Sequence, residues 1–369
     1  MSEAGTSMRT MAPLSRRDLL GKAAALGIGV ASISGFGRLA VAAPNLTSFT
    51  WSGYDAKQFH EAYSAKYKVE PSFSFFSDEE EALQKVRGGF HPDVIHPCVN
   101  TVGRFRDAKV IKPIDTSRLT AWDKIFPALK QVRDVEVDGR VWIAPFDWGT
   151  SSVIYRPDLT QVSEESWSIL IDPKFKGKIS FLDAPDNVAA IAGLLVGAKS
   201  VMNMTDEEMA KAEGVLRQLH QNVRFYWSDQ SQLEQAIASG EIVAAWGWMA
   251  SVVNLTKQGV KVKYMNPKEG IMTWVCGLTI GAEGPADEAQ KYDFLDSMLS
   301  PESGKYLIET DAYGHSNMES FKLANPEAVK ALGFDDPKQF LETGHFFEAV
   351  PADKRKHLIA LWQNIRAGG

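Results

Sequence analysis

The chain has 369 residues, of which 44% are hydrophobic, with a formal net charge of −6 and two cysteines. This length exceeds what one hydrophobic core usually serves, so we expect two lobes. The mild negative charge and the absence of a basic patch argue against a nucleic-acid partner. After the N-terminal region, no stretch approaches the ~18 apolar residues of a membrane-spanning helix, so we expect a mature chain that is not membrane-inserted.

The first 42 residues have the composition of a twin-arginine export signal. The pair Arg16-Arg17 is followed by an apolar run rich in Gly and Ala over residues 23–33, and Ala40-Val41-Ala42 supplies the small residues of a cleavage site. The apolar run is too short to span a bilayer. We therefore predict that residues 1–42 are removed and that the folded chain is exported to the periplasm.

The next hundred residues predict alternating strands and helices. Residues 48–51 alternate like a strand, and Phe59, Tyr63 and Tyr67 share one face of the helix that follows. Residues 70–76 form a second strand, a capping sequence over residues 77–80 begins a helix to Arg87, and residues 93–95 form a short strand. This order favours a parallel sheet with helices on its faces.

A second α/β unit follows in the sequence. Its predicted strands are 141–146, 152–155, 179–182 and 242–246, its predicted helices are 186–197 and 206–221, and the run 273–280 returns the chain to the first lobe. We predict an α/β fold of two lobes, each a mostly parallel sheet with flanking helices, joined by two hinge crossings. The predicted divisions are the signal at 1–42, the first part of lobe 1 at 43–147, lobe 2 at 148–270, and the second part of lobe 1 with the C-terminal helices at 271–369.

Several short segments, taken in their order and spacing, form a pattern that is similar to a known protein family. They are WSGY at 51–54, PFDWGT at 145–150, the stretch 167–179, FLDAP at 181–185, SGE at 239–241, GW at 247–248 and PKEG at 267–270. With these segments the mature chain resembles the spermidine/putrescine-binding family of periplasmic solute receptors over nearly its whole length. The resemblance implies a type II-like periplasmic-binding-protein fold that closes on a small ligand and then docks on an inner-membrane ABC permease.

The resemblance also implies aromatic rings around the ligand. Carried over position by position, these rings belong to Trp51, Tyr54, Trp148, Trp248, Trp274 and Tyr313. Any one of the tryptophans could fill a core instead, and Trp246 favours core packing because it alternates into an apolar strand. A ring within ~6 Å of a cationic group stabilises that group by roughly 0.5–2 kcal/mol. Trp51, Tyr54 and Trp248 stand at turn-like ends, where a core role is less natural.

The acidic positions depart from the family pattern. Where polyamine receptors keep acids, this sequence has Asn187, Ser251 and Cys276. A buried ammonium group without a partner is costly, so such a site should hold a diamine poorly. A quaternary ammonium or sulfonium group needs ring faces rather than carboxylates. We therefore expect the ligand to be a small organic cation or zwitterion, with a polyamine receptor proper as the alternative.

Asp147 replaces a residue that is usually aromatic in this family. It is either a compensating acid or a solvated turn residue, and we expect Asp147→Asn to weaken ligand less than Trp51→Ala or Trp248→Ala. A carboxylate on the ligand would need donors, for which the sequence offers Asn100, Ser151, Ser251, Asn317 or an Arg. The sequence leaves open whether Cys98 and Cys276 pair.

Proteins of other classes fit the sequence less well. The mature sequence contains no Cys-x-x-Cys, His-Glu-x-x-His or Gly-x-Ser-x-Gly, and its histidines are scattered. We therefore predict no enzyme, no catalytic residues, no cofactor and no metal site. An iron receptor would need clustered tyrosines, and an anion receptor would use helix N-termini and Arg. We expect a monomer that binds a small molecule.

Overall fold

The computed structural model describes residues 45–333, 336–343 and 345–368, so the predicted export signal and cleavage site lie outside the described residues. The strands are β1 (Thr47–Trp51), β2 (Ser72–Phe76), β3 (Val94–Ile95), β4 (Ile111–Lys112), β5 (Glu136–Val137), β6 (Arg140–Val141), β7 (Ala144–Tyr155), β8 (Ile179–Leu182), β9 (Val223–Trp227), β10 (Ala244–Trp248), β11 (Lys263–Tyr264), β12 (Met272–Gly281), β13 (Gly314–His315) and β14 (His345–Phe346). The helices are α1 (Lys57–Tyr67), α2 (Glu79–Arg87), α3 (Val99–Asp107), α4 (Pro127–Lys130), α5 (Pro185–Leu195), α6 (Asp206–Asn222), α7 (Gln230–Ser239), α8 (Met249–Lys257), α9 (Glu288–Met298), α10 (Pro301–Asp311), α11 (Ser320–Leu323), α12 (Pro326–Ala331), α13 (Pro337–Thr343) and α14 (Ala352–Arg366). Within these described ranges, no helix is both long and apolar enough to cross a membrane.

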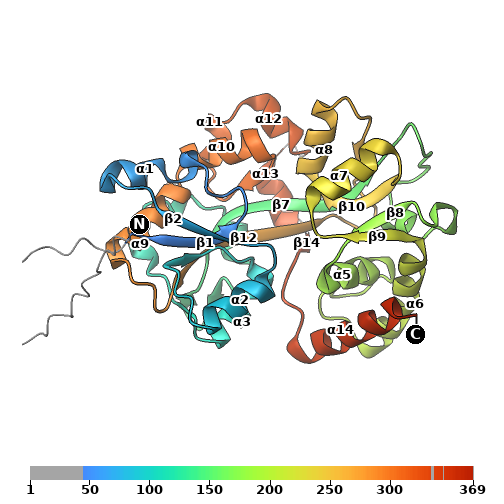
Figure 1. The fold of residues 1–369 in the computed structure, drawn as a ribbon, viewed down its shortest axis with the longest axis horizontal. Helices are drawn as coiled ribbons and strands as arrows, with labels where there is room; N and C mark the ends of the chain where they lie inside the picture. Colours follow the sequence, from blue (N-terminus) through green and yellow to red (C-terminus); the bar gives the residue numbers. More distant parts are fainter. Residues whose placement is uncertain (1–44, 334–335, 344, 369) are drawn as a thin grey trace, which may run out of the picture. The chain divides into compact units, whose positions relative to one another are not determined.

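One continuous sheet runs through the described chain, with the strand order β2-β1-β3-β12-β7-β10-β8-β9. β1 pairs in parallel with β2 and β3, and β8 pairs in parallel with β9 and β10. Between these parallel parts, β7 and β12 are antiparallel to each other and to their outer neighbours. Helices lie on both faces of the sheet (Figure 1). The predicted α/β fold is therefore confirmed.

Two clusters of buried side chains define two lobes. The first cluster lies around β1–β3 with α1–α3 and α9, and the second lies around β8–β10 with α5–α7. β7 passes from one to the other, because Trp148 belongs to the first cluster and Val153 to the second. β12 makes the return, with Met272 in the second cluster and Val275 in the first.

A third passage of the chain, which the sequence did not predict, also connects the two clusters. Leu341 of α13 belongs to the first cluster and Phe347 to the second. Between them, β14 pairs in parallel with β12, with His345 opposite Met272. Three segments of the chain therefore lie at the junction of the lobes.

Helix α14 packs with the second lobe. Leu358, Trp362 and Ile365 of this helix all belong to the second cluster. Their spacing puts them on one helical face, and this apolar stripe requires a core to cover it. The sequence interpretation placed the C-terminal helices of 271–369 in the first lobe, and for α14 the packing corrects that assignment.

Of the segments 141–146 and 152–155, predicted as separate strands, residues 144–146 and 152–155 belong to the single strand β7, while Val141 lies in β6. All residues of β7 are buried. β12 pairs with β7 from Ala144 to Ser151, and β10 pairs with it from Ser151 to Tyr155. Because β12 pairs with β7 through this region and β13 also pairs with Asp147 and Trp148, the strand continues through Asp147 and Gly149, which locally favour a turn.

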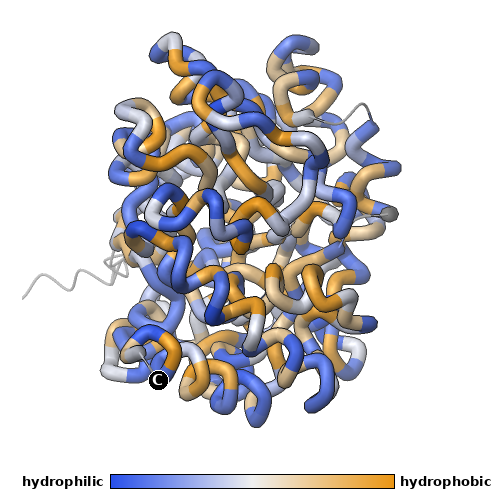
Figure 2. Tube along the Cα trace, turned by 90° about the vertical axis from the view of Figure 1, so that its right-hand side faces the viewer, coloured by the Kyte–Doolittle hydropathy of each residue, from blue (hydrophilic) through white to orange (hydrophobic). Residues whose placement is uncertain are grey.

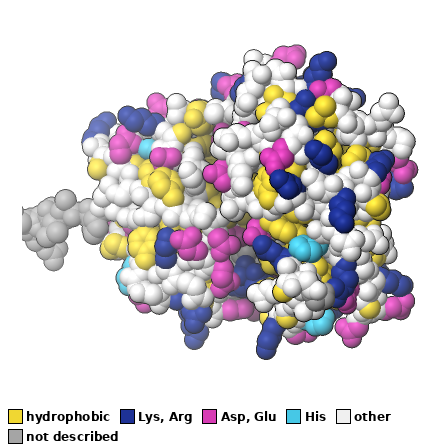
Figure 3. All heavy atoms as spheres, turned by 45° about the vertical axis from the view of Figure 1, so that its right-hand side comes forward, with side chains coloured by type: hydrophobic (Ala, Val, Ile, Leu, Met, Phe, Trp, Pro, Cys, Tyr) yellow, Lys and Arg dark blue, Asp and Glu magenta, His cyan; other side chains and the backbone are white. Residues whose placement is uncertain are grey.

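Hydrophobic and hydrophilic stretches are interspersed along the coiled parts of the chain (Figure 2). This pattern is typical of helices that turn one face to a core. On the face drawn in Figure 3, Lys and Arg side chains are interspersed with Asp and Glu.

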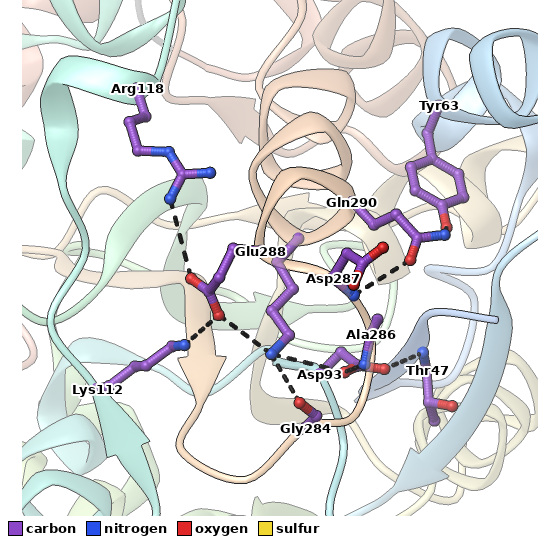
Figure 4. Close-up of polar contacts among 11 residues, drawn as sticks. Thr47, Tyr63, Asp93, Lys112, Arg118, Gly284, Ala286, Asp287, Glu288 and Gln290 are labelled. Carbon is purple, nitrogen blue, oxygen red and sulfur yellow. Dashed lines mark hydrogen bonds and ion pairs between the residues drawn. The ribbon is translucent and has the colours of Figure 1, made fainter. Parts of the chain in front are cut away.

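The buried carboxylate of Asp93 holds the first residue of β1 in place. Trp51 lies at the other end of that strand. Asp93 is 0% exposed and accepts hydrogen bonds from the N–H groups of Thr47 at 2.8 Å and Ala286 at 2.7 Å (Figure 4). The ammonium group of Lys291 lies 3.9 Å from the same carboxylate and donates to the Gly284 carbonyl at 2.7 Å. Because each buried charge has partners, the cluster joins β1 to the loop before α9 without an isolated ion.

A small third cluster joins helix α8 of the second lobe to helices of the first. Ile308, Ala312, Ala324 and Leu332 form it, and Met249 and Val253 of α8 pack against it. The two lobes therefore also touch through side chains beside the crossing strands.

The two cysteines form a disulfide, which answers the question that the sequence left open. Cys98 precedes the first residue of α3 in the first lobe, and Cys276 stands opposite Asp147 in the β7–β12 pair. The bond therefore ties the loop after β3 to a crossing strand.

Replacing both cysteines with Ser should lower the free energy of unfolding by about 2–5 kcal/mol, because a closed loop of this size restricts the unfolded chain. The sequence separation of the two cysteines is 178 residues. Urea unfolding of oxidised wild type and of the double variant Cys98→Ser/Cys276→Ser measures the loss. Reductant should destabilise wild type and leave the double variant unchanged, and equal stability of the two proteins without reductant contradicts the prediction.

Candidate functional site

One face of β7 forms a strip across the junction of the lobes. Because side chains alternate along a strand, Asp147, Gly149 and Ser151 point to the same side. Trp274 of β12 is paired with Gly149, and Trp248 of β10 is paired with Ser151. We call these five residues the crossing strip. It brings together three residues predicted for the site, namely Asp147, Trp248 and Trp274.

The indole of Trp274 lies directly on the backbone of Gly149. A Cβ atom at position 149 would overlap the Trp274 ring, so only Gly fits beneath it. Trp274 also meets Tyr313 edge-on, with ring centroids 4.8 Å apart and an interplanar angle of 89°. Both rings are half-buried, so together they form an aromatic wall that is partly open to ligand.

Asp147 is buried at 1% exposure, which excludes the interpretation as a solvated turn residue. The Tyr54 hydroxyl donates to its Oδ2, and the Nε2 of His96 lies 2.9 Å from its Oδ1. The other ring nitrogen, Nδ1, is 3.0 Å from the Thr50 hydroxyl. The imidazole of His96 therefore bridges the Thr50 hydroxyl and the Asp147 carboxylate, with each ring nitrogen within hydrogen-bond distance of one of them.

A second carboxylate, Asp311 at the end of α10, interacts electrostatically with this group. Burial and then the charge of Asp147 raise the pKa of Asp311 to about 6, while Lys257 opposes the rise. Burial and then the charges of Asp311 and Asp147 also raise the pKa of Tyr313. The pKa of Tyr54 is raised well above its ordinary value by burial and then by Asp147. The group therefore has a negative potential that favours a cation.

The remaining aromatic candidates lie on either side of this group. Trp51 ends β1, is half-buried and packs against Phe76 with ring centroids 4.5 Å apart. Trp248 ends β10, is half-buried and meets Trp227 and Trp246 edge-on at 5.1 and 5.4 Å. Trp246 is 1% exposed and fills the second core, as the sequence favoured.

Two of the predicted polar residues lie in the first turns of helices. Asn187 is half-buried in the first turn of α5. Ser251 is 0% exposed in the first turn of α8, and its hydroxyl has no hydrogen-bond partner among the described residues.

Two predicted site residues are corrected by the structure. Trp148 is 0% exposed in the first core, stacks on Phe321 and Phe340, and donates from Nε1 to the His315 carbonyl at 3.1 Å. It cannot line a pocket on the strip because it alternates with Asp147 and Gly149, and so points to the other face of β7. Cys276 offers no thiol to a ligand because its sulfur is in the disulfide.

Sequence reasoning missed His96 and Asp311. His96 directly follows β3, and the carboxyl ends of parallel strands are where loops of an α/β sheet meet a ligand, so a signal was available. Asp311 lies near the site because it ends α10, and β13, which follows α10, pairs with the crossing strand β7. No pattern in the sequence predicts this pairing.

Asp183 and Asp186, the two acids that shortly precede Asn187 in the sequence, are both paired with arginines of α14. Asp186 accepts from the Nε of Arg355 at 3.0 and 3.1 Å, and Asp183 accepts from Arg366 at 2.6 Å. These ion pairs compensate the charges of both carboxylates at the start of α5.

The fold and the strip at the lobe junction define a two-lobe solute-binding protein. A family model described as "Bacterial extracellular solute-binding protein" matches residues 56–333. The chain belongs to that family, and its relatives include spermidine/putrescine-binding periplasmic proteins.

Individual relatives and solved structures agree with this family. The putrescine-binding periplasmic protein PotF of Escherichia coli strain K12 is 26% identical over 321 residues, which cover 82% of this chain and 85% of that protein. The spermidine/putrescine ABC-transporter substrate-binding protein of Streptococcus pneumoniae superposes with a TM-score of 0.74 at 17% identity, covering 88% of this chain and 98% of that one. A structure described as the Atu4243-GABA receptor gives a TM-score of 0.67 at 20% identity, covering 87% and 97%. These relatives are solute-binding proteins rather than enzymes.

Replacing Gly149 with Ala should displace the Trp274 indole and cost about 1–3 kcal/mol of stability, the usual range for overpacking. The matched control is Gly214→Ala in helix α6, where no heavy atom lies within 4 Å of the added Cβ. That control should be neutral or stabilising, because Ala is favoured over Gly in a helix by about 0.5–1 kcal/mol. Chemical unfolding of both variants checks the prediction, which fails if Gly149→Ala is as stable as wild type.

The raised pKa of Asp311 predicts a dependence of stability on pH. Its ordinary pKa is 3.8 and its folded-state pKa is about 6, so the folded chain binds this proton more tightly than the unfolded chain. The destabilisation is fully present above pH 6 and disappears as the pH falls through 6 towards 4. Urea unfolding should therefore show Asp311→Asn to be more stable than wild type at pH 7, with the difference vanishing near pH 4. A difference that does not change with pH contradicts this assignment.

Proposed function

We propose that the chain is the receptor of an ABC importer for a small organic cation or zwitterion, of quaternary ammonium, sulfonium or amine type. The observation that carries this proposal is the buried carboxylate of Asp147 on β7 beside the half-buried rings of Tyr54, Trp274 and Tyr313, at the junction of the two lobes. Rings and a fixed negative charge both favour a cation, and neither requires a hydrogen-bond donor on the ligand.

Hinge closure gives this site its selectivity. Tyr54 packs against the first core, whereas Trp248 packs against the second. A ligand that touches both lobes stabilises the closed arrangement over the open one, so binding shifts an existing equilibrium. Delivery to an inner-membrane permease, export by the twin-arginine route and a monomeric state belong to the same proposal.

A polyamine receptor proper is the second candidate. The relative from Escherichia coli is named for putrescine, and Asp147 with Asp311 supplies two acids at one end of the site. Against it, the family's acid positions carry Asn187 and Ser251 on the second lobe, and the nearby Asp183 and Asp186 are paired with arginines. A second ammonium group would therefore lack a free carboxylate there.

Calorimetric titration of the mature chain with putrescine, spermidine, choline, glycine betaine and dimethylsulfoniopropionate tests the proposal. At least one of them should bind with saturable one-to-one stoichiometry and without turnover. Strongest binding by putrescine or spermidine favours the second candidate, and no binding by any member contradicts the proposed ligand class.

Trp274→Ala should weaken the bound ligand by about tenfold or more, because it removes one wall of the cation site. Trp122→Ala is the matched control, since Trp122 is also half-buried but has the ammonium of Lys130 5.5 Å from its ring. Because Asp147 is buried, Asp147→Asn is now expected to cost as much affinity as Trp274→Ala. An unchanged affinity in Trp274→Ala contradicts the aromatic site, and a much larger loss in Asp147→Asn favours a primary amine.

A further inference from the structure

Two helices of the second lobe begin at one edge of its sheet. β8 and β10 are parallel neighbours, so their carboxyl ends lie at the same edge, and α5 and α8 start there. Neither Ala184 before α5 nor Trp248 before α8 caps its helix with a side-chain hydrogen bond. By contrast, α7 starts after β9 and is capped by Asp229, which accepts from the Ser231 N–H at 2.7 Å. The first turn of α8 therefore keeps N–H groups for another acceptor. The first turn of α5 has fewer, because Pro185 has no N–H and the Asn187 N–H donates to the Ala184 carbonyl at 3.1 Å.

A polar side chain stands at the third position of each uncapped helix, Asn187 in α5 and Ser251 in α8. In a helix the Cα–Cβ bond tilts towards the N-terminus, so both side chains lean towards this edge. The Ser251 hydroxyl is buried at 0% exposure and has no partner within the described part of the chain. A buried hydroxyl without a partner is costly, so an acceptor from the ligand would satisfy it.

The charge at this edge also favours an anion. The positive ends of two helix dipoles lie at this same edge of the sheet, and such ends stabilise negative groups and disfavour cations. The acids Asp183 and Asp186 are compensated by Arg366 and Arg355, at 2.6 and 3.0 Å. The electrostatic potential at this edge is therefore opposite in sign to the potential at the first-lobe end of the site, where Asp147 lies.

We infer that the N-terminus of α8 with the Ser251 hydroxyl, helped by the Asn187 side chain at the start of α5, binds a carboxylate of the ligand. This inference rests on the proposed cation site and narrows its ligand to a zwitterion with a cationic group at Asp147 and a carboxylate at the second lobe. Ser151, which is paired with Trp248 at the start of α8, lies four residues from Asp147 along β7, a span of roughly 13 Å. The ligand is therefore extended, with its charges separated by several carbon atoms.

The test uses matched pairs of probes that differ only in the carboxylate. They are 4-aminobutanoate, 5-aminopentanoate and 6-aminohexanoate, each compared by calorimetry with the straight-chain amine of the same carbon number, and putrescine as a dication. The best amino acid should bind the mature wild type at least about tenfold more tightly than its matched amine, the gain expected for a hydrogen-bonded charge.

Three variants test whether the tighter binding of the amino acid comes from the start of α8. Ser251→Ala should lower the affinity for the amino acid by about tenfold and leave the amine unchanged. Ser251→Asp should reverse the preference, weakening the amino acid and strengthening putrescine. Ser303→Ala is the control. The Ser303 hydroxyl is also buried and has no hydrogen-bond partner among the described residues, and Ser303 also stands at the third position of its helix, α10. That helix, however, is capped by the Ser300 side chain. The Ser303→Ala substitution should change neither affinity.

The outcomes separate this inference from the proposed function. If amines bind as well as their matched amino acids, or if Ser251→Ala weakens both alike, the carboxylate site is wrong and the cation site stands. If Ser251→Asp binds putrescine no better than wild type does, the placement of the carboxylate at α8 is wrong. If neither amines, amino acids nor the quaternary and sulfonium compounds bind, the proposed function and this inference fall together.

Discussion

The antiparallel pairing of β7 with β12 is the constraint on which the rest of the structure depends. It joins two parallel sheets into one, carries the chain between two cores, and sets Trp274 on Gly149. The disulfide at Cys276 and the hydrogen bonds at Asp147 both attach the first lobe to this pair. The centre of the site is therefore built on paired strands, whereas Tyr54 and Tyr313 come from the segments next to them.

Sequence reasoning was strongest where local pattern and tertiary structure agree. The strands at 48–51 and 179–182 and the long helix near 206–221 follow directly from hydrophobic periodicity, because each turns one face to a core. It was weakest within β7. Asp147 and Gly149 suggest a turn locally, whereas pairing with β12 makes them part of a strand, and tertiary context overrides propensity there.

The same alternation explains which candidate residues came together. Once β7 is a strand, Asp147 and Trp148 must point to opposite faces, so they could not both line one site, and Trp148 fills the core. The pairing of Cys98 with Cys276 and the position of Asp311 depend on contacts between segments far apart in the chain. A single sequence contains no pattern that fixes such contacts. His96 was different, because its place after a parallel strand was enough to make it a candidate.

Helix α8 has two roles at once. Its first turn holds Ser251 next to Trp248, and its flank presses Met249 and Val253 on the small apolar cluster from α10 to α12. Because Met249, Ser251 and Val253 stand on one helix of nine residues, they move together. In the proposed hinge closure, a ligand that draws in Ser251 must therefore also shift the contacts of Met249 and Val253 with this apolar cluster, so that occupancy of the site alters the packing of α10 to α12.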